Sequence, residues 1–193
     1  MPLVLKSTLL TREQMGMERE RSIRAAAEEK LLEMAHAALG PGKRLVIRDL
    51  TPDDLGCANN EWTYQRTGGT AFAWADLDIP ETAGDVIADN RFVAILGLRI
   101  SDGHLSAPLA LLKFTVGGSE VARWEMSQAF MLYTQNTSGS IDHKNPPCIA
   151  EAPIFISQNT PFAIAEYVSD PNKDYKVTFI GLVVEPEGKV LKG

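Results

Sequence analysis

The chain has few of the residues on which catalytic and metal sites are usually built. Among 193 residues there are only three histidines and two cysteines. His36, His104 and His143 stand far apart and form no His-x-His pair, so a converging metal site of the cupin type is not expected. Cys57 and Cys148 are also distant in sequence. We expect two free thiols in a reducing compartment rather than a disulfide.

Long apolar runs and a surplus of positive charge are missing as well. No stretch approaches the ~20 apolar residues of a membrane-spanning helix, and the first residues lack the charged-then-apolar order of a secretory signal. The 19 basic and 25 acidic residues give a net charge of −6, whereas a protein that coats nucleic acid normally carries a basic surplus. We therefore expect neither a membrane nor a nucleic acid as partner.

Motifs of the common catalytic and ligand-binding sites are absent too. No Gly-x-Ser-x-Gly sequence accompanies the polar pair Asp142-His143, and no Asp-x-Asp-x-Asp-Gly loop surrounds Asp53-Asp54. Neither Gly68-Gly69 nor Gly117-Gly118 is followed by Lys-Ser or Lys-Thr, so both are predicted to be hairpin turns rather than phosphate loops. The sequence thus predicts no catalytic residue, no metal site and no cofactor.

The chain does contain a long series of β-strand patterns. Apolar, β-branched and aromatic residues gather in short stretches, and Gly, Pro, Asn and Asp separate the stretches. About eight to nine strands are predicted, with no helix alternating between them, which is typical of a β-sandwich or barrel. Residues 153–157, 162–168 and 175–185 form the clearest group and predict a meander. Phe179, Ile180 and Leu182 are expected in a central strand that is paired on both sides.

The first forty residues differ from this pattern. Residues 1–10 predict an extended arm, and residues 12–39 predict one long α-helix. A capping box of Thr11 and Gln14 precedes this helix, and Gly40-Pro41-Gly42 follows it. The expected division is therefore an arm and helix over 1–40 and a β-sandwich over 41–193.

The two halves of the predicted helix suggest different roles. The second half has an apolar stripe that fits its own domain, whereas the first half carries charge on nearly every side. We expect residues 1–24 to contact neighbouring subunits, so that removal of residues 1–20 leaves a folded β domain that no longer assembles. The predicted subunit-interface residues are Leu3, Leu5, Leu9, Leu10, Met15, Met17, Arg19, Arg21 and Arg24.

The three tryptophans allow two interpretations. Trp62, Trp74 and Trp124 contain the flat aromatic surface that stacks on sugars, but Trp62 and Trp74 alternate with other residues as core-facing side chains do. Packing in the core or between subunits is the favoured interpretation, and glycan binding stays the alternative.

The closing strands resemble those of a known group of proteins. Pro153-Ile154-Phe155-Ile156, Phe162-Ala163-Ile164 and the apolar-Gly-apolar stretch Val177–Pro186 are similar to the ends of jelly-roll virion structural proteins of bacterial viruses. The resemblance covers about residues 43–186 in organisation. Such domains serve as single jelly-roll capsid proteins and as cement (decoration) proteins that hold capsomers together.

The resemblance implies a non-enzymatic subunit of the capsid shell, made in the host cytoplasm and without cofactor. Its partners would be copies of itself together with a major capsid protein or neighbouring capsid subunits. The alternative on the same fold is a carbohydrate-binding or cupin-like β-sandwich module, because one fold supports unrelated functions.

Overall fold

The computed structural model of the chain describes residues 5–57, 62, 70–77, 79–82, 84–101, 109–125, 147–169 and 176–188. These residues form nine strands, two α-helices and one 3₁₀ turn, η1. Their bounds in chain order are β1 Leu5–Thr11, α1 Arg12–Met15, α2 Met17–Leu39, β2 Leu45–Asp49, η1 Pro52–Leu55, β3 Trp74–Asp76, β4 Phe92–Ser101, β5 Leu109–Val116, β6 Ser119–Glu125, β7 Cys148–Ile156, β8 Phe162–Val168 and β9 Lys176–Pro186.

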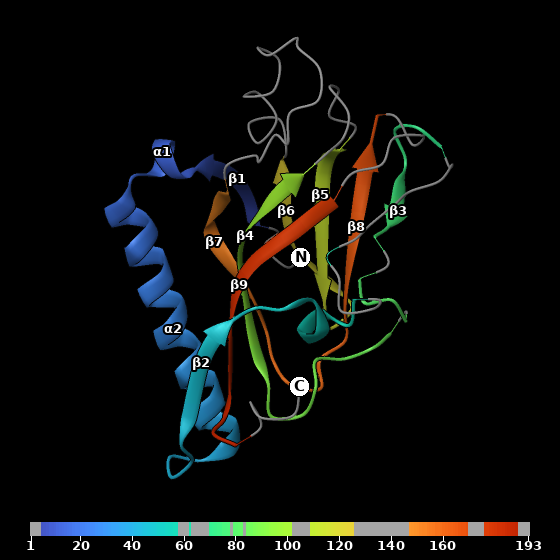
Figure 1. Ribbon diagram of the computed structural model, residues 1–193. Coiled ribbons are helices and arrows are strands. Elements are labelled where there is room, and N and C mark those ends of the chain that lie inside the picture. The colour runs from blue at the N-terminus through green and yellow to red at the C-terminus, as the bar shows by residue number, and fades with distance from the viewer. Residues whose placement is uncertain are drawn as a thin grey trace.

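Eight of the strands form two sheets with jelly-roll topology (Figure 1). One sheet has the order β2-β9-β4-β7 and the other the order β3-β8-β5-β6. The pairs β2–β9, β3–β8, β4–β7 and β5–β6 are all antiparallel, so residues 45–186 form one long hairpin with β5–β6 at its tip. Rolling up this hairpin places β9 beside β4 and β8 beside β5. The predicted jelly-roll-like β-sandwich is confirmed.

The predicted meander over residues 148–186 is wrong. β7 and β9 belong to one sheet and β8 to the other, and none of the three pairs with another. Turn residues indicate that the chain reverses direction, but they do not select the strand with which it pairs. In a rolled hairpin, consecutive strands lie in opposite sheets except at the tip. Here the tip is the Gly117-Gly118 turn, which joins the paired strands β5 and β6 and was predicted to be a hairpin turn.

β1 joins the two sheets along one edge. Its first residues, Leu5 to Thr8, run parallel to β6, and Leu9 to Thr11 pair antiparallel with β7. From Leu5 onward, the predicted extended arm is therefore a strand of the sandwich. The sequence shows no clear alternation here because the hydrogen-bonding partner changes from one sheet to the other within seven residues.

The predicted single helix is divided in two. The capping box of Thr11 and Gln14 is confirmed and begins α1, but α1 ends after four residues at Gly16. Gly16 has φ 78° and ψ 145°, a conformation that side-chain-bearing residues rarely adopt. The chain changes direction there, and α2 continues to Leu39, just before Gly40.

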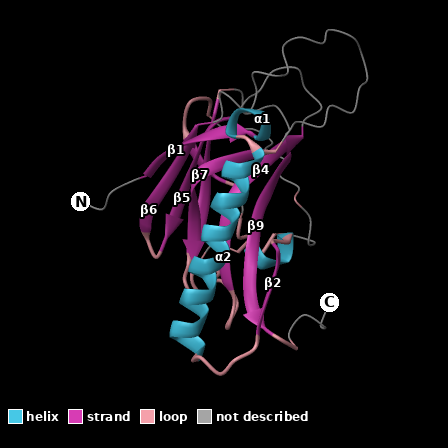
Figure 2. Cartoon of the chain, turned by 90° about the vertical axis from the view of Figure 1, so that its left-hand side faces the viewer, coloured by secondary structure: helices cyan, strands magenta, loops and turns pink. Residues whose placement is uncertain are grey.

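α2 covers the outer face of the β2-β9-β4-β7 sheet, which we call the covered sheet (Figure 2). Ala27, Leu31 and Ala35 are buried in an apolar layer between helix and sheet. The sheet contributes mainly alternate residues of β4 and β9 to this layer, namely Phe92, Ala94, Leu96, Leu182 and Val184. The other set of alternate residues, such as Val93 and Val183, faces the second sheet. Burial on both faces explains why these two strands are apolar throughout.

The interior of the sandwich is filled by large side chains. Phe179 lies 5.9 Å from Trp62 and 6.1 Å from Phe114, measured between ring centroids. β9 lies between β2 and β4, which confirms the prediction of a central strand. The glycine of the apolar-Gly-apolar stretch has a packing reason: a Cβ on Gly181 would stand 2.2 Å from the carbonyl oxygen of Ala94.

Candidate interaction surface

The outer face of the β3-β8-β5-β6 sheet, which we call the open sheet, is not covered by either described helix (Figure 1). α2 packs on β4, β7 and β9 instead. The strand register places Trp74 and Leu111 opposite Tyr167, and Arg123 opposite Lys113. The residues between these in sequence, such as Leu112 and Trp124, belong to the core, so the first set points outward.

Aromatic and cationic side chains gather on this outer face. The ring centroids of Trp74 and Phe72 lie 5.5 Å and 6.2 Å from that of Tyr167. Lys113 Nζ is 4.7 Å and Arg123 Cζ 5.3 Å from the centroid of Trp74, within the range of cation–π attraction. We call Phe72, Trp74, Lys113, Arg123 and Tyr167 the open-face cluster.

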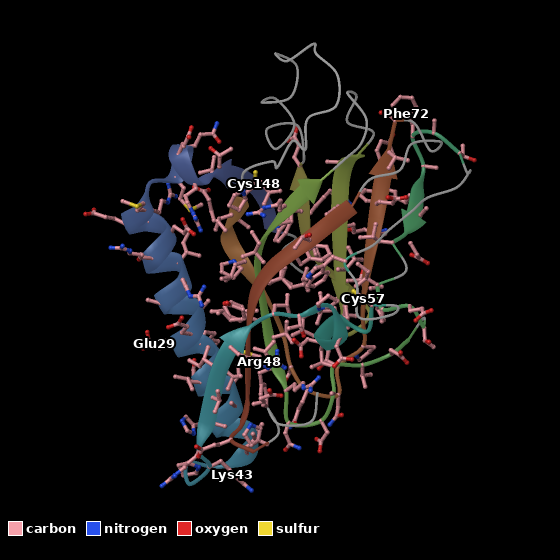
Figure 3. The ribbon with its side chains drawn as sticks, in the orientation of Figure 1. Glu29, Lys43, Arg48, Cys57, Phe72 and Cys148 are labelled. Atoms are coloured by element: carbon pink, nitrogen blue, oxygen red, sulfur yellow. The ribbon has the colours of Figure 1, made fainter. Side chains whose placement is uncertain are left out.

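Phe72 is the most exposed ring of the cluster. It is 66% exposed, and Figure 3 shows it at an end of the molecule remote from Glu29 on α2. Its φ of 54° is uncommon for an aromatic residue. The Phe72 N–H donates to the Val168 carbonyl oxygen over 2.8 Å, which holds the residue in this conformation. A large apolar ring kept in water by a strained backbone suggests a contact role.

The two cations of the cluster, Arg123 and Lys113, differ in whether a described carboxylate pairs with them. Arg123 donates two hydrogen bonds to Glu120, of 3.0 and 3.1 Å. No ion pair of Lys113 is found among the described residues. Its ammonium group is therefore the charge with which an acidic group of a partner can pair.

The structure separates the three tryptophans. Trp124 is buried in the sandwich, and Trp62 packs against the same core, edge-on to Phe179. Only Trp74 lies on an outer face, and Lys113 and Arg123 already stand over its ring. Core packing is thus confirmed for Trp62 and Trp124. The alternative prediction, that Trp62 stacks on a sugar, would need an exposed ring, and the Trp62 ring packs against the core.

Two predicted interface residues lie inside the protein's own core. Leu9 is fully buried between the sheets, and Met15 is the buried residue of α1. The prediction that Leu9 contacts a neighbouring subunit is therefore wrong, because β1 inserts as a strand and turns this side chain inward. Neither residue is available to a neighbouring subunit.

The other apolar residues of the predicted interface are distributed differently. Met17 is 67% exposed and, with Arg12, Glu13, Gly16 and Pro147, lines a shallow hollow at the junction of the helices. Leu10 is half-buried. Leu5 pairs through its backbone with Ala122, and Leu3 lies outside the described residues.

Of the three predicted interface arginines, two are paired within the chain. Arg19 binds Glu151 of β7, and Arg24 binds Asp49 at 3.0 Å and Glu28 at 3.1 Å. These pairs fasten the charged half of α2 to its own sheet, whereas Arg21 is exposed. Sequence alone could not show this, because Glu151 and Asp49 approach the helix only in the folded chain.

A buried ionic cluster joins β2 and β9 to η1 and to Arg91, the residue before β4. Arg48 binds Asp54 at 2.6 Å and Glu185 at 2.7 Å, and Arg91 binds the same two carboxylates at 3.2 and 2.9 Å. Asp54 also accepts hydrogen bonds from the N–H and hydroxyl of Thr51 and thereby caps η1. The ion pairs of Asp54 were not predicted from the sequence, because Arg48 and Arg91 reach it only in the folded chain.

The ion pairs of this cluster control the charge state of its carboxylates. Burial by itself raises the pKa of Asp54, but hydrogen bonds from Arg48 and Thr51 outweigh burial and lower it. The pKa of Glu185 is lowered in the same way by Arg48 and Arg91, against the effect of burial. Both groups are therefore charged at neutral pH, and two cations balance two anions inside the fold.

The remaining candidates for chemistry contribute little to a site. Cys57 and Cys148 have reduced thiols, as predicted, and burial raises their pKa to about 12 and about 11, so both stay protonated at neutral pH. His36 is exposed at the end of α2, whereas His104 and the pair Asp142-His143 lie outside the described residues. In the described part of the chain, no three His, Cys, Asp or Glu residues are arranged to hold a metal ion.

Comparison with protein-family models and with curated proteins gives no match to this chain. In the described residues, neither helix has the length and apolar character needed to cross a bilayer.

Proposed function

We propose that the chain is a non-enzymatic structural subunit of a virion shell, either a jelly-roll capsid subunit or a cement (decoration) subunit. The observation that carries the proposal is the unequal covering of the two sheets. The chain's own helix covers one outer face, whereas the other presents the open-face cluster. The resemblance of the closing strands to jelly-roll virion proteins agrees with this role.

The open-face cluster suits contact with a neighbouring shell subunit. Phe72 and Tyr167 supply large apolar area at small entropic cost, and the ammonium of Lys113, which has no carboxylate partner among the described residues, adds a charge that selects an acidic partner. A buried Phe side chain is worth roughly 1.5–3 kcal/mol. Repetition of such a contact around a shell makes a weak pairwise interaction sufficient for assembly.

Substitutions that keep the fold and change only this surface test the proposal. Phe72→Ala and Lys113→Glu are expected to weaken self-association or binding to shells by about tenfold or more, equivalent to about 1.4 kcal/mol. Lys30→Glu, an exposed reversal on α2 far from the open face, is the matched control. Light scattering and co-sedimentation with shells measure the effect. Unchanged assembly in both open-face variants, with normal circular dichroism, would refute the proposed surface.

A carbohydrate-binding module is the second candidate, and one observation favours it. Phe72, Tyr167 and Trp74 form a row of rings on an open sheet, an arrangement that can stack on sugars. The cations over Trp74 reduce the ring surface left for a sugar. A glycan array with the wild type and Tyr167→Ala separates the two functions: saturable binding that the substitution abolishes would support the second. A cupin-like site gains no support from His36, which lies outside the sandwich.

A further inference from the structure

One edge of the covered sheet carries backbone groups that have no partner among the described residues. Among the described strands, β2 is the outermost of that sheet and pairs only with β9 (Figure 2). The Leu50 N–H donates to Gly181 O, and the Glu187 N–H donates to Arg44 O. Because alternate residues of an antiparallel strand bond to the same neighbour, the even-numbered residues of β2 face β9. The N–H and C=O groups of Leu45 and Ile47 therefore point away from the sheet, and no described residue bonds to them.

This edge lacks two of the usual features that prevent strand addition, proline and a bulge. β2 contains no proline, and its pairing with β9 has no bulge. Three of its five residues are apolar, Leu45, Val46 and Ile47. The edge of the open sheet differs, since its outermost strand β3 has only three residues and offers too little length for a stable pairing.

We propose that β2 pairs antiparallel with β2 of a second copy of the chain, related by a two-fold axis at Val46. In this register Leu45 lies opposite Ile47 of the second copy, and Lys43 lies opposite its Asp49. The Asp49 side chain is 79% exposed, and Lys43 stands at the exposed turn between α2 and β2 (Figure 3). The two-fold axis creates the Lys43–Asp49 pair twice, which selects this register over its neighbours.

The edge is held ready for this pairing by the buried ionic cluster. Arg48 points into the fold and is fixed by Asp54 and Glu185, so β2 needs no ordering before it binds. The register also brings Arg44 opposite Arg48 of the second copy. Each of these has a carboxylate of its own chain, Glu187 at 3.6 Å for Arg44 and Asp54 at 2.6 Å for Arg48, which limits their repulsion.

The pairing has a defined geometric consequence. Residues that lie opposite each other in an antiparallel pair project to the same side of the sheet. The two copies therefore place both α2 helices on one side of a continuous sheet and both open sheets on the other. The dimer does not depend on the shell function proposed above, because it uses a different surface.

A charge swap tests the register. Asp49→Lys replaces both attractive pairs by Lys–Lys contacts and is expected to raise the dimer dissociation constant about tenfold or more. The double variant Lys43→Asp/Asp49→Lys restores the opposite charges and should recover dimerisation. Arg24→Ala is the control, since it removes the intramolecular partner of Asp49 and leaves the contact between copies unchanged. Analytical ultracentrifugation measures the constants. A monomeric wild type, or a swap that fails to recover, overturns the proposal.

A second measurement uses cross-linking and is independent of charge. Val46 lies opposite itself in a non-hydrogen-bonded pair, where Cα atoms stand about 4.5 Å apart, a distance that a disulfide bridges. Val46→Cys is expected to give a covalent dimer on mild oxidation, while Ala25→Cys on the exposed side of α2 is not. Absence of the Val46→Cys dimer overturns the edge pairing. Loss of assembly in Phe72→Ala with this cross-link intact would concern the open face alone.

Discussion

Phe179 and Phe72 are two phenylalanines, one buried and one exposed. Phe179 is 2% exposed between two aromatic rings, and Phe72 is 66% exposed. Phe179→Ala is expected to lower the free energy of unfolding by about 3–5 kcal/mol, since it loses burial and leaves a cavity. Phe72→Ala is the matched control and should change it by about 0.5 kcal/mol or less. Urea denaturation measures both, and a loss below about 1 kcal/mol for Phe179→Ala would contradict its central position.

Asp54 is the residue through which the ionic cluster is best tested. Asp54→Asn removes a buried charge that two arginines share and is expected to cost about 3 kcal/mol of unfolding free energy. Glu33→Gln removes an exposed carboxylate paired with Lys30 and should cost about 0.5 kcal/mol or less. Equal losses of unfolding free energy for the two substitutions in urea denaturation would show that the buried cluster stabilises the fold no more than an exposed ion pair does.

The same cluster determines how stability responds to acid. Asp54 and Glu185 have pKa values below their ordinary 3.8 and 4.5 in the folded chain, so the folded state holds its charges more strongly than the unfolded state. Their contribution is complete above the ordinary pKa values and is lost as the pH falls through the lowered ones. Unfolding free energy should be insensitive to these groups at pH 5–8 and fall below about pH 4. Asp54→Asn should flatten this acid limb, and denaturation at a series of pH values measures it.

At the scale of elements, β1 makes the N-terminal segment a part of the sandwich. It pairs with β6 and β7 and buries Leu9, which is a reason to expect, against the sequence-based prediction, that a chain without residues 1–20 does not stay folded. Leu9→Ala is expected to cost about 2–5 kcal/mol of stability, and deletion of 1–20 should give an unfolded or aggregating protein. Met17→Ala is the control with an exposed side chain. Retention of cooperative unfolding after the deletion would show that β1 is dispensable.

The break between α1 and α2 depends on one residue. Gly16 has φ 78° with open space around its Cα, so a side chain there meets backbone strain rather than a clash. Gly16→Ala is expected to cost about 1–3 kcal/mol. Gly42→Ala, where space is also open and φ is ordinary, should have little effect. Thermal unfolding followed at 222 nm compares them, and equal midpoints would mean that the break is not required.

At the scale of the whole molecule, helix and sandwich form one unit. α2 buries Ala27, Leu31 and Ala35 on the covered sheet, and β1 ties the segment before it to both sheets. Helix loss seen by circular dichroism and tryptophan fluorescence from the sandwich should therefore follow one urea transition. Two separated transitions would instead support independent units over residues 1–40 and 41–193.

The sequence by itself determined where several strands and the end of the long helix lie along the chain. Turn residues and apolar stretches are local, so they located β7, β8, β9 and the helix end at Gly40 from neighbouring residues alone. The even apolar character of β9 also predicted its central position. Capping by Thr11 is a contact over three residues, and it too was predictable.

Only the tertiary structure decided which elements meet. Strand pairing joins residues far apart in sequence, so the sequence suggested a meander where the fold is a rolled hairpin. For the same reason it could not bring Arg48 to Asp54 and Glu185, Arg24 to Asp49, or Lys113 and Arg123 to Trp74. The burial of Leu9 was decided in the same way. An apolar side chain in an arm can enter either the protein's own core or that of a neighbour, and the pairing of β1 with both sheets places Leu9 in its own core.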